Sequence, residues 1–132
     1  MIPLPSYASG SCYLIRPSPT AERIDGATVQ LRYCRSGGAI EIALTDYFTK
    51  TELPPFADYL REDAMAALTT FAQRNSIDLA EWNIKVSDFA YHPVDNKSRT
   101  MRLAIYNALT SAFAIWKTLK IDLPQSLQEG IS

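Results

Sequence analysis

The sequence predicts an α+β fold of two layers, in which two helices cover one face of a four-stranded sheet in the order β-β-β-α-β-α. Residues 27–33 and 82–86 alternate apolar and polar side chains, the period of a strand with one buried face. Residues 54–74 and 98–120 are predicted helices, because apolar side chains recur there at every third or fourth position, which is typical of amphipathic helices. Helices and a sheet that each have one apolar face bury one another most simply as two layers.

The composition indicates a single globular domain. The 132 residues are 47% hydrophobic and 20% charged, and the formal net charge of -1 lacks the basic excess of non-specific nucleic-acid binders. We expect an N-terminal arm at 1–10 and a flexible tail at 124–132. Because no apolar stretch approaches a membrane span and the N-terminus lacks the pattern of a signal peptide, we expect a cytoplasmic protein without membrane contact.

The N-terminal half contains three strand candidates. Residues 12–16 form a weak first strand, and 20–26 read as a loop. Residues 27–33 and 40–45 alternate clearly, and Ser36-Gly37-Gly38 between them tolerates a positive φ angle. We therefore predict that these two runs form an antiparallel hairpin.

The C-terminal half reads as helix, strand, helix. Pro54-Pro55 suits the first turn of a helix that extends to 74, on which Asp63 is expected to lie outside the apolar stripe. The phase of the fourth strand shifts at Asp88-Phe89, which indicates a bulge. The second helix follows over 98–120. The predicted core contains Leu60, Leu68, Phe71, Trp82, Ile84, Val86, Ile105, Leu109, Phe113 and Trp116.

The segment around the only histidine resembles a known family. Tyr91, His92, Val94 and Asp95 are followed at fixed spacing by Ala104, Ala108, Ala112 and Phe113, with Met101 and Leu109 at apolar positions. This pattern is similar to Ser-Tyr-His-x-Val-Asp-Ser-Ser and the helix after it in domain IV of translation elongation factor G. The match is confined to residues 90–113, where Phe89-Ala90 and Asn96-Lys97 differ from the family pattern.

The resemblance implies both a topology and a function. Domain IV has a left-handed strand-helix-strand crossover, so we expect one over 39–90 against the general right-handed preference. Domain IV reaches the decoding centre of the small ribosomal subunit through the turn that carries the Tyr-His motif. The resemblance thus implies a non-enzymatic binding module that contacts RNA or the small ribosomal subunit through the 91–102 turn. The candidate binding residues are Tyr91, His92, Asp95, Asn96, Lys97, Arg99 and Arg102.

An enzyme is the first alternative. His92 could act as an acid or base beside Asp88 or Asp95, although the position of Asp95 before a helix favours a capping role. Cys12 and Cys34 are not spaced as metal ligands and are expected to be free thiols. We therefore predict no catalytic residues, no metal and no cofactor.

A structural subunit is the second alternative. The open face of the sheet, or the edge strand at 11–16, could pair with a protein partner or with another copy of the chain.

Overall fold

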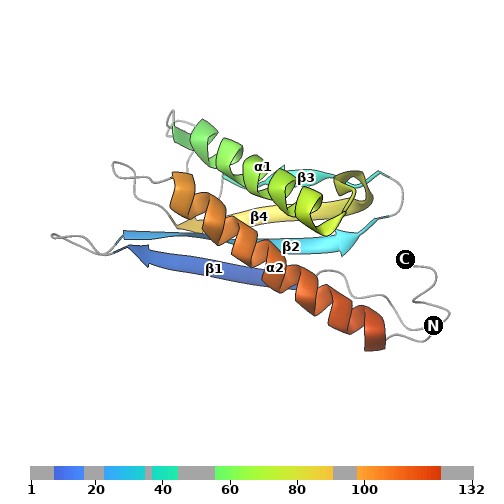
Figure 1. Ribbon diagram of the computed structural model, residues 1–132. Coiled ribbons are helices and arrows are strands. Elements are labelled where there is room, and N and C mark those ends of the chain that lie inside the picture. The colour runs from blue at the N-terminus through green and yellow to red at the C-terminus, as the bar shows by residue number, and fades with distance from the viewer. Residues whose placement is uncertain (1–7, 17–22, 35–36, 45–55, 91–97, 123–132) are drawn as a thin grey trace.

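The computed structural model describes residues 8–16, 23–34, 37–44, 56–90 and 98–122 (Figure 1), and the structural statements below concern these residues. The elements follow the predicted order, with one short 3-10 turn, η1, before the last strand. They are β1 (Ala8–Arg16), β2 (Arg23–Tyr33), β3 (Ile40–Ile42), α1 (Phe56–Asn75), η1 (Leu79–Glu81), β4 (Trp82–Ala90) and α2 (Ser98–Asp122).

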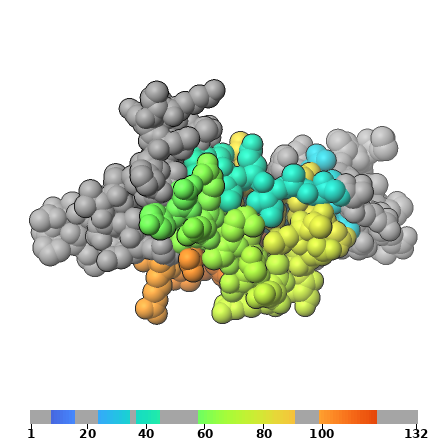
Figure 2. Space-filling view, turned by 90° about the horizontal axis from the view of Figure 1, so that it is seen from above, coloured from blue at the N-terminus to red at the C-terminus, as the bar shows by residue number. Residues whose placement is uncertain are grey.

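The four strands form one mixed sheet in the order β1-β2-β4-β3. β2 pairs antiparallel with β1 and with β4, whereas β3 pairs parallel with β4. Both helices lie on the same face of this sheet (Figure 1), so the predicted two-layer α+β sandwich is confirmed. Seen from above, residues 37–44 lie next to α1 along one edge of the molecule (Figure 2).

The connection from β3 through α1 to β4 is left-handed. When the sheet in Figure 1 is viewed from the helix side with β3 and β4 pointing upward, β4 lies to the left of β3. Parallel strands joined through a helix follow the opposite hand in about 98% of cases. The unusual hand is the one that the resemblance to domain IV implies.

The predicted hairpin between 27–33 and 40–45 is wrong. β3 is parallel to β4, where Ile40 aligns with Ile84, and β2 separates β4 from β1. After β2 the chain does not turn back to pair with β2 but passes the start of β4 to reach its other side. There the amide of Gly38 donates to the carbonyl of Ala80 at 2.8 Å. A Cβ atom on Gly38 would collide with the backbone of Trp82. The glycine therefore permits a close crossing rather than a hairpin turn.

The first two strands are longer than the sequence indicates. β1 begins at Ala8 rather than residue 12, and β2 begins at Arg23, inside the expected loop at 20–26. Small side chains allow this extension. Ala8 is 2% exposed, and a Cβ atom on Gly10 would lie 2.5 Å from the carbonyl oxygen of Ala108, so β1 touches the backbone of α2.

The core lies between the sheet and the two helices, as predicted. Of the predicted core residues, seven aliphatic and aromatic side chains and Trp82 are buried. Trp116 and Phe113 are only partly buried and pack against the edge of this core. The predicted bulge is also present, since the pairing of β2 with β4 shifts between Gly26 and Thr28 and Asp88 has a φ angle of 52°.

Candidate basic surface on the two helices

The described part of the predicted site is the start of α2. Residues 91–97 lie outside the described residues, and with them Tyr91, His92, Asp95, Asn96 and Lys97. Arg99 and Arg102 occupy the first turns of α2, and both side chains are exposed. The structure therefore describes two of the seven candidate binding residues, and it gives Arg102 a partner that the sequence did not reveal.

Arg102 forms an ion pair with Asp63 of α1. Its Nε donates to Oδ1 of Asp63 at 2.9 Å, with the Arg102 side chain 51% exposed and the Asp63 side chain 1% exposed. The prediction that Asp63 lies outside the apolar stripe is wrong, because α2 covers that side of α1. A buried carboxylate needs a charged or hydrogen-bonding partner, which Arg102 supplies. In return, the carboxylate fixes the orientation of the guanidinium.

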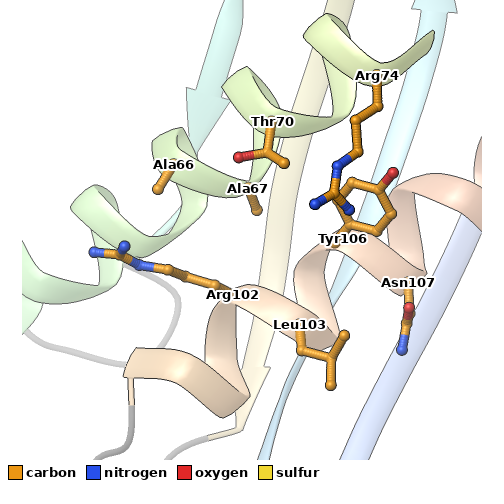
Figure 3. Close-up of a pocket in the computed structure, with 8 residues that line it drawn as sticks. All are labelled: Ala66, Ala67, Thr70, Arg74, Arg102, Leu103, Tyr106 and Asn107. Atoms are coloured by element: carbon orange, nitrogen blue, oxygen red, sulfur yellow. The ribbon is translucent and has the colours of Figure 1, made fainter.

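A groove runs between the outer sides of the two helices (Figure 3). We call it the interhelix groove, and its volume is about 310 Å³. α1 contributes Ala66, Ala67, Thr70 and Arg74, and α2 contributes Arg102, Leu103, Tyr106 and Asn107. Of the residues that the structure describes, none that lines the groove is acidic. The groove therefore combines two arginines, one of which is paired with Asp63, with polar groups and apolar side chains.

Arg74 extends across the groove to α2. Its guanidinium carbon lies 5.4 Å from the centre of the Tyr106 ring, a cation–π distance (Figure 3). The Tyr106 ring is itself held edge-on against Phe71, at 5.5 Å between ring centres. Arg102 reaches from α2 to α1 and Arg74 from α1 to α2, so each guanidinium is positioned by the opposite helix.

Sequence reasoning missed Asp63, Arg74 and Tyr106. Tyr106 follows Arg102 by one helical turn, so the sequence could have placed these two side chains on one face of α2. Arg74 and Asp63 could not be added to that face, because they come from α1 and meet α2 only through the tertiary packing.

The residues considered for chemistry are not brought together within the described chain. Asp88, the carboxylate considered for an enzyme, is exposed at the bulge of β4, whereas His92 and Asp95 lie outside the described residues. Cys12 and Cys34 are half-buried free thiols. Three or more potential metal ligands do not gather anywhere in the described ranges.

The open face of the sheet carries exposed apolar side chains at one end. Tyr13 and Ile24 are each 42% exposed and Ile15 is 61% exposed, on the paired strands β1 and β2. The hydroxyl of Tyr13 donates to the carbonyl of Asp88 at 2.8 Å, which holds its ring across the sheet. Neither described helix has the length and hydrophobicity needed to cross a membrane.

Comparison with known proteins supports the fold. No protein-family model matches the chain, and no curated protein matches it. A crystal structure of a protein from Thermus thermophilus is similar, with a TM-score of 0.58 and 14% sequence identity. The similarity covers 84% of this chain and 16% of that protein, so this chain corresponds to a small part of its length. At this identity the likeness shows a shared two-layer α+β fold.

Proposed function

We propose that this chain is a non-enzymatic binding module that contacts RNA of the small ribosomal subunit through the 91–102 turn. The observation that carries the proposal is the pair of exposed arginines, Arg99 and Arg102, in the first turns of α2. They directly follow the segment whose Tyr-His-x-Val-Asp pattern resembles the tip of elongation factor G domain IV. The left-handed crossover between β3 and β4 agrees with the same resemblance.

The chemistry of the arginines suits RNA. A guanidinium presents planar, paired donors that match phosphate oxygens, and it keeps its charge at any physiological pH. Arg99 and Arg102 belong to one rigid helix, so their spacing is fixed before binding. Because the net charge of the chain is -1, attraction to RNA has to come from such a local cluster rather than from the whole surface.

The test is binding to isolated small ribosomal subunits at low salt. We compare the wild type with His92→Ala, with Arg99→Ala and with the double variant Arg99→Ala/Arg102→Ala. Arg61→Ala is the matched control, because Arg61 is an exposed arginine of α1 that pairs with the exposed Asp58 at 2.9 Å.

We expect Arg99→Ala to weaken binding about tenfold, the effect of roughly 1.4 kcal/mol, and Arg61→Ala to leave it unchanged. Each basic residue removed should also lower the slope of log affinity against log salt by roughly one unit or less. Equal binding by all variants, or no binding by the wild type, contradicts the proposal. Urea unfolding of each variant separates loss of contact from loss of fold.

A self-associating structural subunit is the second candidate, favoured by the exposed Tyr13, Ile15 and Ile24 beside the edge strand β1. Measuring the molar mass of the protein in solution at high concentration tests whether it self-associates. A strictly monomeric protein counts against this candidate.

A further inference from the structure

We propose that the interhelix groove is a second RNA contact, which binds the phosphate backbone of a single strand at Arg74 and Arg102. The proposal rests on the proposed function only for the identity of the ligand as RNA. It adds Arg74 of α1 to the binding surface, a residue far in sequence from the 91–102 turn.

The charge of the groove favours a polyanion. Arg74 and Arg102 face it from opposite helices (Figure 3), and its lining residues include no carboxylate among those described. Thr70 adds a hydroxyl that can donate to phosphate or ribose oxygens, whereas the amide nitrogen of Asn107 donates to Sγ of Cys12 at 3.8 Å. The buried Asp63 accepts from Nε of Arg102 and offsets part of its charge, but half of the Arg102 side chain remains exposed.

The two arginines occupy different places in the groove. Arg102 is anchored at Asp63 by the 2.9 Å bond, and the guanidinium of Arg74 rests on the Tyr106 ring (Figure 3). Successive phosphates of an extended strand can contact both places at once, which favours a chain over a single small anion. At about 310 Å³ the groove is too small to enclose a duplex, so the proposed ligand is a single strand.

The two guanidiniums are positioned before any ligand arrives. Asp63 orients Arg102 through the 2.9 Å bond, and the Tyr106 ring supports Arg74 at 5.4 Å. Long side chains that are already ordered lose less rotamer freedom on binding, so more of the phosphate attraction appears as affinity. Tyr106 and Asp63 are positioning residues in this arrangement.

The experiment measures binding of a labelled oligouridine of about 12 nucleotides to the full chain by fluorescence anisotropy, from roughly 50 to 200 mM salt. The variants are Arg74→Gln, Arg74→Lys and the control Arg61→Gln on the other side of the same helix. Arg74 and Arg61 are both exposed, so neither substitution alters the core, and equal urea midpoints verify this.

We expect Arg74→Gln to weaken binding about five- to tenfold and to lower the salt slope by about 0.7, the value for one single-strand phosphate. Arg74→Lys keeps the charge but loses the flat contact with Tyr106. Its affinity for the oligonucleotide should therefore lie between those of the wild type and Arg74→Gln. Arg61→Gln should match the wild type. Unchanged binding by Arg74→Gln, or no binding of the oligonucleotide by the wild type, overturns the proposal.

Further arms distinguish the ligand and the site. Duplex RNA that binds as tightly as oligouridine, with the same dependence on Arg74, overturns the single-strand assignment. Displacement of oligouridine by polyglutamate of equal length, at equal concentration, identifies an acidic peptide and overturns the RNA assignment.

Subunit binding that needs Arg99 but not Arg74 overturns the groove as an RNA contact and keeps the proposed function. Oligouridine binding that needs Arg74, without subunit binding, supports the groove and defeats the proposed function.

Discussion

Replacing Gly10 by alanine tests the contact between β1 and α2. The new Cβ atom would lie 2.5 Å from the carbonyl oxygen of Ala108 and 2.5 Å from the amide nitrogen of Ala112, whereas ordinary contacts are 3.4–4 Å. Both partners are backbone atoms of a helix whose Ala108 and Ala112 side chains are fully buried, so no flexible side chain can move aside. The strand and the helix must therefore separate by roughly 1 Å, a gap that forfeits a quarter to a half of each dispersion contact.

Two opposing effects set the magnitude. Overpacking a tight contact typically costs about 1–3 kcal/mol, and the rigid backbone at Gly10 places it at the upper end. Alanine also restricts the unfolded chain, which stabilises the fold by about 0.4–1 kcal/mol. The clash is the larger effect, and we expect Gly10→Ala to lower the free energy of unfolding by roughly 2–2.5 kcal/mol.

Urea unfolding followed by tryptophan fluorescence measures this difference. Trp82 and Trp116 pack together with 4.9 Å between ring centres, so their emission reports loss of the core. The matched control is Ser9→Ala, the next residue along β1, which is exposed and should stay within about 0.5 kcal/mol of the wild type. An equal urea midpoint for Gly10→Ala and wild type would refute the placement of β1 against α2.

Three further predictions concern the free energy of unfolding, and urea unfolding measures each of them. Leu109→Ala removes a side chain that is 1% exposed and should cost about 2–5 kcal/mol. Leu103→Ala, at a residue 53% exposed, should cost under about 0.5 kcal/mol. Similar costs for both would contradict the side of α2 that packs against the sheet. Asp63→Asn removes the charge that Arg102 pairs with and should cost roughly 1–2 kcal/mol, less than a fully buried pair because Arg102 is half exposed; no loss would count against the bridge. Asp88→Val places a branched side chain at a φ angle of 52° and should cost about 1–3 kcal/mol, whereas Asp88→Asn should be neutral; a neutral valine would exclude the bulge.

The helices could be predicted from the sequence because their signals are local. The apolar repeat from Met101 to Ala112 defines the buried face of α2 without reference to any other element. The same logic failed at Asp63, whose burial depends on where α2 lies. A carboxylate reads as solvent-facing in a sequence pattern unless its partner is known, and Arg102 lies 39 residues away.

The neighbours of each strand could not be predicted in the same way. Alternation over 40–45 indicated a strand, and β3 spans Ile40–Ile42 of that range. Alternation does not identify the neighbouring strand, because it is the same whichever strand lies beside it. The glycines at 37–38 suggested a turn, since the sequence does not reveal that Trp82 passes against Gly38. For the candidate site, the sequence indicated Arg99 and Arg102, and the tertiary packing added Arg74.

The order of strands in the sheet has a consequence for folding during synthesis. β1 and β2 can pair as soon as both have been made, yet β3 is made before the only described strand beside it, β4. The buried alanines of α2 that close over β1 are made later still. The apolar sides of the early strands therefore stay open until α2 has left the ribosome. Folding is then governed by contacts between distant parts of the chain, which form slowly, and the waiting strands need protection from aggregation.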